Sequence, residues 1–371
     1  MTKNVLYIVS TLKRTGPTNI IYNLIDKLDR SKFRPVILTL SKEEEGFPSL
    51  MDEFRNLGVE IHSLSLTRVA GFLLGKRKLQ RFIEDHQIDI IHVNGIRGDM
   101  LINKNDYPGI PIVTTINSNI YDDYTMLYGK QKGQVMSWTH IKSIKGKIIV
   151  ACSNFVSEEV GERYGIDLKV IYNGIPKDLY VVSGKAKKDQ FRKTLQLPPD
   201  KKIFVFVGNL IYRKNPVMVI KAFLSAKCSS DSHLVMIGDG PLMTDCEEIA
   251  KGHPNVSLLG NKSETLPYLN ASDYYISSAY SEGLPTSVME AMGCGLPVLL
   301  SSIKPHTELV QKMVNWRYLF PVDDAAELAQ KIDEVTGDSY EDLSAQCRDV
   351  IENHINSNLM AEAYQELYTI K

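Results

Sequence analysis

Short runs of hydrophobic residues recur along the chain and alternate with stretches in which hydrophobic residues stand three or four positions apart. The runs are rich in β-branched residues and end at polar ones, which is typical of strands buried on both faces. In the first half these runs are NVLYIVS, RPVILTL, IDIIHVN, IPIVTTI, KIIVACS and LKVIYNG. The stretches between them, such as PTNIIYNLIDKLDR at residues 17–30, have helical spacing. The alternation predicts parallel βαβ units.

The same alternation restarts after a polar, lysine-rich stretch at residues 183–202. The runs of the second half are KIFVFVGN, HLVMIGDG, NVSLLGN, DYYISSA and LPVLLSS. A chain of 371 residues is also longer than one core of common size requires. The sequence therefore predicts an α/β protein with two Rossmann-like, doubly wound domains joined near residues 175–200. Residues 357–371 predict a final amphipathic helix with Leu359, Ala363, Leu367 and Ile370 on one face.

Composition narrows the class of protein. A net charge of −1 excludes a generally basic nucleic-acid binder. The five cysteines are scattered without a CxxC pair, so they indicate neither a disulfide framework nor a cysteine-based zinc site. The first apolar run is shorter than the core of a signal peptide, and no run approaches the ~18 residues that span a bilayer. We expect a cytoplasmic protein.

The loops that follow the strands are where ligands bind in open α/β sheets. VGNLIYRKNP (207–216) leaves a strand through Gly208 and presents Arg213 and Lys214 just before a helix predicted near Pro216. Adjacent cations at a helix N-terminus suit a phosphate group, although a solvated basic turn would have the same sequence. The IGDGPL segment does not indicate a dinucleotide fingerprint, because Met243 replaces the third glycine of GxGxxG.

Two glutamates stand out in SEGLPTSVMEAMGCGLPV (281–298), where Glu282 and Glu290 lie among small and apolar residues with seven residues between them. Buried carboxylates usually have a partner. The segment predicts a glycine turn and a helix that begins at residues 285–287 and ends at 293–295. The amides at such a helix N-terminus attract phosphate, while a carboxylate accepts hydrogen bonds from sugar hydroxyls. This combination suggests a nucleotide sugar, and the alternative is a pair of surface carboxylates.

The segment EGLPTSVMEAMGCGLPV resembles the signature of the retaining glycosyltransferase family 4, in which two glutamates with this spacing precede a small-residue turn. Other segments resemble the family in the same order: NGIPKDLY, VGNLIYRKNP, GDGP, VSLLGN and SDYYISSAYSEG. The resemblance implies a GT-B fold of two Rossmann-like domains that face each other across a cleft. Residues 1–182 would form the acceptor-side domain and 183–355 the nucleotide-sugar-binding domain. Residues 356–371 would form a C-terminal helix that returns to the first domain.

The resemblance also implies roles for individual residues. Glu290 would hold the ribose hydroxyls, Arg213 and Lys214 the pyrophosphate, and Glu282 the donor sugar. The catalytic set would be Glu282, Arg213 and Lys214, with Asn117 on the acceptor side. The implied donor site consists of Gly16, Gly208, Asn209, Arg213, Lys214, Asn261, Lys262, Glu282, Gly283, Leu284, Pro285, Thr286 and Glu290. No metal or cofactor is expected, because fixed cations and helix ends would neutralise the diphosphate.

Three positions depart from the family pattern, and all concern the phosphate or the transferred sugar. Asn209 stands where many members have arginine, so phosphate neutralisation would rest on Arg213 and Lys214. Asn117 stands where many have a histidine beside the sugar. Of the paired glycines in the first loop, TGPTN keeps only Gly16.

Three further features of the sequence can each be interpreted in two ways. His92 is interpreted as a hydrogen-bonded strand-end histidine rather than a catalyst, and Asp122 with Asp123 as a solvated pair rather than a metal site. Residues 126–147 contain five lysines, no acids and several apolar side chains. Such a stretch suits an anionic membrane near a lipid-linked acceptor, or a solvated helix packed on the core.

The expected activity is a hexosyltransferase or N-acetylhexosaminyltransferase that moves a sugar from a nucleotide diphosphate donor, a UDP-sugar, to a hydroxyl of a glycan or lipid-linked glycan. The reaction would retain the anomeric configuration and serve bacterial surface-polysaccharide synthesis. The chain would be cytoplasmic, with possible peripheral contact at the inner face of the membrane. The alternatives are a nucleotide-sugar epimerase on the same fold and a non-catalytic nucleotide-sugar-binding subunit.

Overall fold

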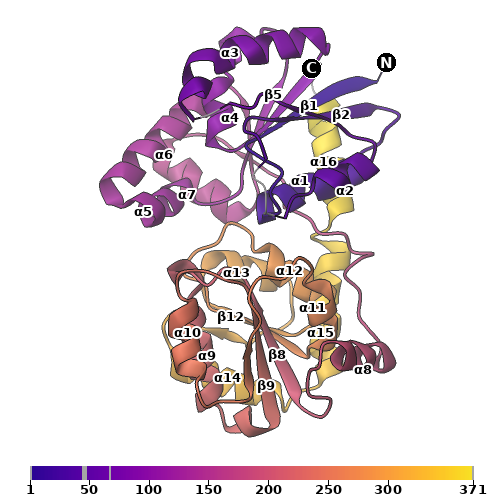
Figure 1. Ribbon diagram of the computed structural model, residues 1–371, viewed down its shortest axis with the longest axis vertical. Coiled ribbons are helices and arrows are strands. Elements are labelled where there is room, and N and C mark those ends of the chain that lie inside the picture. The colour runs from indigo at the N-terminus through magenta and orange to yellow at the C-terminus, as the bar shows by residue number, and fades with distance from the viewer. Residues whose placement is uncertain (1, 44–47, 67, 370–371) are drawn as a thin grey trace. The chain divides into compact units, whose positions relative to one another are not determined.

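The computed structural model describes residues 2–43, 48–66 and 68–369 (Figure 1). It divides into two compact units, the first formed by Met1–Gly174 with Ser357–Lys371 and the second by Ile175–Asn356. Each unit contains one parallel sheet with helices packed on it. The sequence-based boundaries, after residues 182 and 355, lie within eight residues and one residue of these divisions. The C-terminal helix belongs to the first unit.

The first unit contains a seven-stranded parallel sheet in the order β3-β2-β1-β4-β5-β6-β7. Its strands are β1 Lys3–Val9, β2 Phe33–Thr39, β3 Glu60–Ser63, β4 Ile90–Asn94, β5 Ile112–Ile116, β6 Ile148–Ala151 and β7 Lys169–Val170. The sequence predicted six of them. It missed β3 because this edge strand is short, polar and only half-buried, so it lacks an apolar run.

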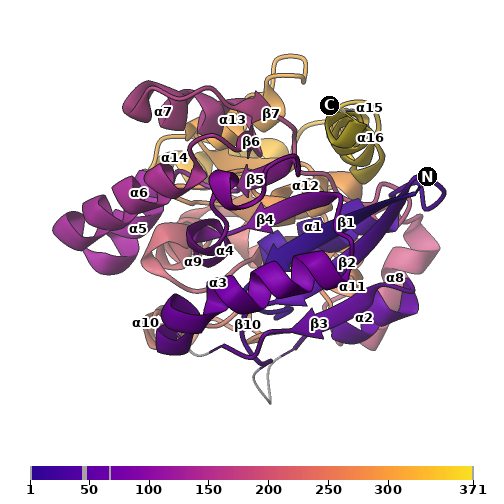
Figure 2. The same ribbon diagram turned by 90° about the horizontal axis from the view of Figure 1, so that it is seen from above.

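Alternate residues of β1 enter two different cores. Val5 and Tyr7 pack with α1 and α16, whereas Leu6 and Ile8 pack with α3 on the other face of the sheet. Figure 1 shows α1 and α16 side by side, and Figure 2 shows the same unit from above. The helices of this unit are α1 Gly16–Asp26, α2 Met51–Asn56, α3 Arg68–Asp85, α4 Ile96–Leu101, α5 Ile120–Tyr128, α6 Lys130–Ile144, α7 Asn154–Tyr164 and α16 Ser357–Thr369, with one 3-10 turn at Lys104–Asp106.

The last helix, α16, forms as predicted, but its buried face is different. The buried side chains are Met360, Ala361, Tyr364, Leu367 and Tyr368. Leu359, which the sequence placed on the buried face, is 41% exposed. Leu367 is buried and Ala363 packs partly buried on the same core, so the prediction was wrong for Leu359. It missed the two buried tyrosines, whose hydroxyl groups find partners in Tyr7, His92 and Thr115. Ile370 lies outside the described residues.

The second unit contains a six-stranded parallel sheet in the order β10-β9-β8-β11-β12-β13. Its strands are β8 Lys202–Val207, β9 Ser232–Ile237, β10 Val256–Leu258, β11 Tyr274–Ser277, β12 Val298–Ser301 and β13 Leu319–Phe320. Its helices are α8 Lys185–Thr194, α9 Pro216–Ser225, α10 Met243–Ala250, α11 Leu266–Ala271, α12 Thr286–Gly293, α13 Lys304–Val310, α14 Ala325–Val335 and α15 Tyr340–Asn353, with 3-10 turns at Tyr212–Lys214 and Lys227–Asp231. The sequence predicted five of these strands, and missed the two-residue β13.

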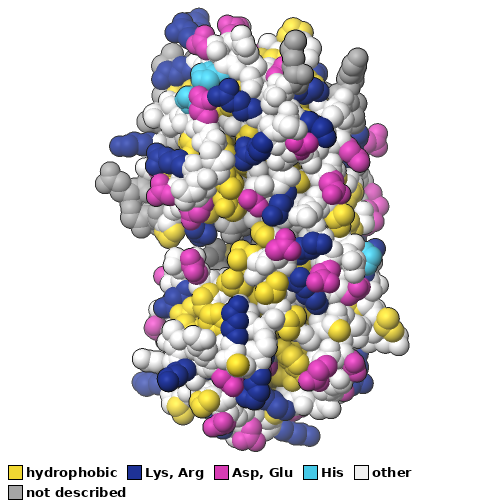
Figure 3. All heavy atoms as spheres, turned by 90° about the vertical axis from the view of Figure 1, so that its right-hand side faces the viewer, with side chains coloured by type: hydrophobic (Ala, Val, Ile, Leu, Met, Phe, Trp, Pro, Cys, Tyr) yellow, Lys and Arg dark blue, Asp and Glu magenta, His cyan; other side chains and the backbone are white. Residues whose placement is uncertain are grey.

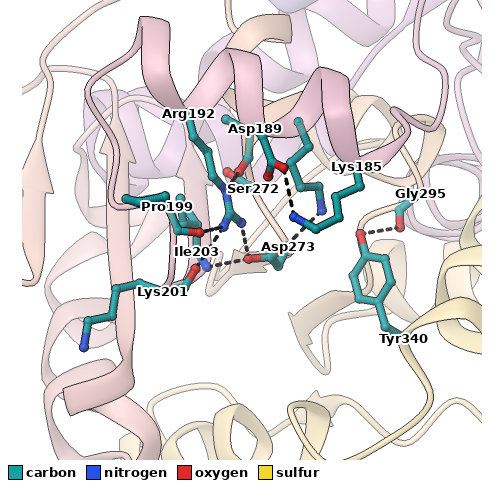
Figure 4. Close-up of polar contacts among 12 residues, drawn as sticks. Lys185, Asp189, Arg192, Pro199, Lys201, Ile203, Ser272, Asp273, Gly295 and Tyr340 are labelled. Carbon is teal, nitrogen blue, oxygen red and sulfur yellow. Dashed lines mark hydrogen bonds and ion pairs between the residues drawn. The ribbon is translucent and has the colours of Figure 1, made fainter.

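Strands β8 and β11 are neighbours in this sheet although two strands separate them in the chain. The strand order therefore changes direction between them, which is where open α/β sheets form a crevice at their carboxyl ends. At the opposite ends, Arg192 of α8 fixes both strands (Figure 4). Its guanidinium donates to the Asp273 carboxylate at 2.6 Å, and the same carboxylate accepts from the Ile203 amide at 2.7 Å. The two strands are thus held in register at the end remote from the crevice.

Charged side chains of both signs are mixed on the face drawn in Figure 3, where no area of a single sign dominates. This agrees with the near-zero net charge of the chain.

Candidate functional site

The loop that follows β8 carries the two adjacent cations. It passes through a 3-10 turn at Tyr212–Lys214, and Asn215 then takes the left-handed conformation with φ 49° before α9 begins at Pro216. The segment that follows β11 forms hydrogen bonds to the backbone of this loop. The Ser278 hydroxyl donates to the carbonyl oxygen atoms of Lys214 and Asn215 at 3.0 and 2.9 Å. The Tyr280 amide donates to the Arg213 carbonyl at 2.8 Å. The exits of β8 and β11 therefore form one structure.

Glu282 lies between the two cations and is 7% exposed. Arg213 donates to its Oε2 at 3.0 Å and to the Ser281 carbonyl at 2.5 Å, while Lys214 donates to its Oε1. Burial alone would raise the pKa of Glu282, but the charges of Lys214 and Arg213 outweigh it and hold the pKa below its usual value. Glu282 is therefore an ionised carboxylate with two cationic partners, at the switch point of the sheet.

Glu290 is buried to the same degree but has a different environment. It lies in the second turn of α12 and is 9% exposed. Among the residues that the structure describes, no cation forms an ion pair with it. Its burial raises its pKa to about 7, which a hydrogen bond with Tyr180 only partly offsets. A carboxylate in this position gains most from a ligand that donates hydrogen bonds.

The turn between the two glutamates forms as the sequence predicts. Gly283 and Leu284 are buried, and α12 begins at Thr286 after Pro285. The helix ends at Gly293, and Gly295 follows with φ 74°, where an added Cβ would lie 2.5 Å from the Ser344 hydroxyl. The first amides of α12 thus follow directly on the buried Glu282 segment, where backbone N–H groups suit an anion.

The loop after β9 lies against the β8 loop, and the loop after β10 contacts the β9 loop through the bond from the Gly238 amide to the Gly260 carbonyl. Gly238 and Gly240 have φ angles of 141° and 158°, and a Cβ on Gly238 would lie 1.9 Å from the Gly208 carbonyl oxygen. The glycines of the GDG segment therefore permit close backbone packing against the β8 loop. Asn209 is exposed at the start of the β8 loop, and Asn261 with Lys262 is exposed at the exit of β10. These three side chains lie at the same edge of the sheet as the Glu282 cluster.

The two remaining candidates belong to the first unit. Gly16 is exposed at the first position of α1. Asn117 follows β5, where its amide nitrogen donates to Asn94 at 3.2 Å and its amide oxygen accepts from Asn173 at 3.0 Å. Asn117 is therefore part of a chain of three asparagines at strand exits.

Sequence reasoning missed several residues that shape the site. Tyr180 was quoted only as the end of the NGIPKDLY motif, yet it contacts Glu290. His306 is fully buried near Glu282, and its Nδ1 donates to the Ser301 carbonyl at 2.9 Å. Burial lowers the pKa of His306 to about 4, so the imidazole is neutral. A histidine directly after a proline at the start of a helix was the only signal for this position.

The structure shows the surroundings of His92 and of the Asp122–Asp123 pair. His92 is 2% exposed and hydrogen-bonded at both ring nitrogen atoms, to Tyr368 at 2.6 Å and Thr115 at 2.7 Å, which confirms that it is a hydrogen-bonded histidine, although it lies in the middle of β4 and not at its end. Asp122 accepts a hydrogen bond from Asn119 at 2.8 Å. In the part of the chain that the structure describes, neither Asp122 nor Asp123 belongs to a group of three possible metal ligands.

The basic stretch at residues 126–147 forms the end of α5, a turn at Gly129 and all of α6. It has an exposed part, here called the α5–α6 surface, which consists of Met126, Leu127, Tyr128, Lys130, Lys132, Val135, Trp138, Lys142 and Lys145. Lys147 does not belong to it, contrary to the sequence-based expectation. Its side chain is fully buried and pairs with Asp99 at 2.8 Å, because Asp99 is itself buried and needs a cation. No helix in the described ranges is both long and apolar enough to cross a bilayer.

Two family models match the chain, one in each half. The model described as Glycosyltransferase Family 4 matches residues 14–179, and the model described as Glycosyl transferases group 1 matches residues 187–356. The second match contains Arg213, Lys214, Glu282 and Glu290, the residues of the buried clusters described above. The chain belongs to glycosyltransferase family 4. It is a glycosyltransferase with the GT-B fold.

Relatives of this glycosyltransferase include two bacterial glycosyltransferases. It is 28% identical over 250 residues to the putative teichuronic acid biosynthesis glycosyltransferase TuaC of Bacillus subtilis, covering 64% of this chain and 60% of the relative. It is 26% identical over 307 residues to the Escherichia coli UDP-Gal:alpha-D-GlcNAc-diphosphoundecaprenol alpha-1,3-galactosyltransferase, covering 78% and 77%. Among solved structures, Anabaena HepE in complex with UDP and glucose matches with a TM-score of 0.82, 16% identity and 98% and 99% coverage.

Proposed function

We propose that this glycosyltransferase transfers a sugar from a UDP-sugar to a hydroxyl of a lipid-linked glycan during bacterial surface-polysaccharide synthesis, with retention of configuration. The observation that carries the proposal is the contrast between two buried glutamates on one loop and helix. Glu282 is neutralised by Arg213 and Lys214, whereas Glu290 has a hydrogen-bonding partner but no cationic partner within the described ranges of the chain. A ligand with a diphosphate and ribose hydroxyls complements both features.

In the proposed donor pose, Glu290 accepts hydrogen bonds from the ribose, and the Arg213–Lys214 pair faces the diphosphate. Glu282 and the amides after Gly283 contact the donor sugar. Gly208, Asn209, Leu284, Pro285 and Thr286 line the phosphate and sugar, and Asn261 and Lys262 border the base. UDP is favoured among nucleotides because the solved structure of HepE, which shares this fold, binds UDP.

The proposed chemistry is a front-face displacement. The acceptor hydroxyl attacks the anomeric carbon as the bond to the phosphate oxygen breaks, and the departing phosphate oxygen takes the acceptor proton. Negative charge grows on the diphosphate during this step, so Arg213 and Lys214 stabilise the transition state more than the ground state. No metal is needed in this scheme, because the two cations and the α12 amides supply the neutralising charge.

The α5–α6 surface supports a membrane-bound acceptor. Leu127 is 69% exposed and Trp138 is 54% exposed, which is unusual for side chains of this size. Val135, Trp138 and Lys142 follow one another at helical spacing in α6, so apolar and cationic side chains lie on the same stripe, and Lys145 is exposed just after the helix ends. Such a stripe suits the boundary of an anionic bilayer. The name of the galactosyltransferase relative likewise includes a lipid-linked acceptor.

A donor screen followed by a turnover assay tests the proposal. UDP, GDP and ADP are compared by thermal shift, and we expect UDP to give the largest rise in melting temperature. Consumption of the matching nucleotide sugar is then measured with and without lipid-linked glycan acceptors. Release of UDP that requires an acceptor supports transfer. Epimerised donor without an acceptor would identify an epimerase, and binding without turnover would indicate a non-catalytic subunit.

A further inference from the structure

A group of three possible metal ligands lies in the first unit, outside the residues assigned to sugar transfer. Glu60 and His62 are on the edge strand β3, and His86 follows the end of α3. One ligand atom from each residue lies within 4.8 Å of the others. From this arrangement we propose a zinc site formed by Glu60, His62 and His86, which links β3 to the end of α3.

The strand places two of the ligands on one face. Glu60 and His62 are two positions apart in β3, so their side chains point to the same side of the sheet. His62 Nε2 lies 2.6 Å from Glu60 Oε1, and His86 Nε2 lies 4.0 Å from the same oxygen. In a tetrahedral site with metal–ligand bonds near 2.0 Å, ligand atoms are about 3.3 Å apart. The observed separations bracket this value, so small side-chain rotations would bring all three onto one ion.

Hydrogen bonds outside the group already orient its ligands. His86 Nδ1 lies 2.9 Å from the Phe82 carbonyl oxygen, which can only accept, so Nδ1 carries the proton. The other nitrogen, Nε2, therefore has its lone pair on the side of Glu60 and His62. Metal-binding histidines usually have a partner of this kind on their second nitrogen. Arg34 of β2 takes the remaining carboxylate oxygen of Glu60 at 3.1 Å, which leaves Oε1 for a metal.

Aromatic contacts fix the imidazole rings. Phe82 stacks on His86 with 3.8 Å between ring centroids, and it meets the edge of His62 at 5.0 Å. Both histidines are partly buried, so ordering them on a metal costs little further side-chain entropy.

The chemistry of the ligands selects the ion. Two imidazole nitrogen atoms and one carboxylate oxygen suit Zn²⁺, with water in the fourth position, whereas Mg²⁺ and Ca²⁺ prefer oxygen ligands. Zinc replaces the proton that His62 shares with Glu60. Because β3 is the edge of the sheet, an ion that joins it to α3 stabilises the folded first unit by mass action.

Zinc titration of tag-free, metal-free protein tests the proposal, with binding followed by calorimetry and by competition with a chromophoric chelator. We expect one Zn²⁺ per chain and a higher melting temperature with zinc. His62→Ala, His86→Ala and Glu60→Gln should each weaken binding by at least about tenfold, since even loss of an outer hydrogen-bond partner has an effect of this size. The matched control is His253→Ala, which removes an exposed histidine in the other unit and should bind zinc as the wild type does.

Two further measurements keep the result interpretable. The melting curve without metal shows whether each variant is folded. If the alanine variants are not folded, Glu60→Gln still tests the site, because it retains the shape of the side chain. The site is independent of the proposed donor chemistry, so zinc should change the melting temperature without being required for turnover. Absence of stoichiometric binding to the wild type at about 100 μM zinc, or equal binding by the wild type and the three variants, would overturn the proposal.

Discussion

Glu282, in the loop before α12, and Glu290, in the second turn of that helix, are buried alike, yet the pKa of Glu282 is lowered and that of Glu290 is raised to about 7. The difference comes from Arg213 and Lys214, which contact only the first carboxylate. In the unliganded site the charge of Glu282 is therefore balanced by cations, whereas the hydrogen bond with Tyr180 only partly offsets the burial of the Glu290 carboxyl group. This contrast leads to the predictions below.

Glu290 should lower the stability of the unliganded protein at high pH. Its pKa in the folded state, about 7, lies above the ordinary 4.5, so the folded protein binds more protons between these values and the free energy of unfolding falls as pH rises. Glu290→Gln should match the wild type near pH 4.5 and be more stable by on the order of 2 kcal/mol at pH 8. Melting curves across this range provide the measurement. Glu247→Gln, at an exposed site on α10, is the control and should show no such trend.

Lys214 should contribute more to the transition state than to donor binding. Lys214→Ala should reduce kcat/KM by roughly 30-fold or more, with kcat lowered as well as KM raised, because negative charge on the diphosphate grows as the bond breaks. Steady-state kinetics check this. Lys221→Ala removes an exposed lysine from α9 and should leave both constants unchanged. A rise in KM alone would mean that Lys214 only binds the donor.

Transfer should not require a divalent metal. Turnover should persist in EDTA, since Arg213, Lys214 and the α12 amides neutralise the diphosphate. Chelation is expected to remove zinc from Glu60, His62 and His86 and lower the melting temperature at the same time. Loss of turnover in EDTA that Mg²⁺ or Mn²⁺ restores would contradict the donor chemistry proposed here.

The α5–α6 surface should bind anionic vesicles in a salt-dependent manner. Lys142→Gln with Lys145→Gln should weaken binding roughly tenfold or more, at about 1 kcal/mol per lysine. Lys147 is left in place because its removal would leave the buried Asp99 with His140 and Thr114 but without its lysine partner. The control variant is Lys187→Gln with Lys193→Gln, which makes the same change in charge at exposed positions of α8. Equal sedimentation with neutral and anionic vesicles would rule out an electrostatic contact.

Sequence patterns predicted those features of the fold that depend on the local spacing of residues. The buried strands appeared as apolar runs, and α12 was bounded correctly because glycines and a proline mark both ends. β3 was missed because an edge strand need not be apolar. The buried tyrosines of α16 were missed because the sequence pattern was judged from aliphatic residues alone, although Leu367 is buried as predicted. The ion pair between Lys147 and Asp99 joins residues far apart in the chain, so no local pattern could show it. The same holds for Tyr180 beside Glu290.

Calorimetry of UDP binding to Glu282→Gln and Glu290→Gln tests the central claim most directly. Glu290 is proposed to hold ribose hydroxyls that do not change during reaction, so Glu290→Gln should weaken UDP by ~1.5–3 kcal/mol. Glu282 is proposed to act beside the sugar, so Glu282→Gln should retain UDP affinity while its kcat falls. If Glu282→Gln loses UDP and Glu290→Gln keeps it, the donor lies in the opposite orientation and the account is wrong.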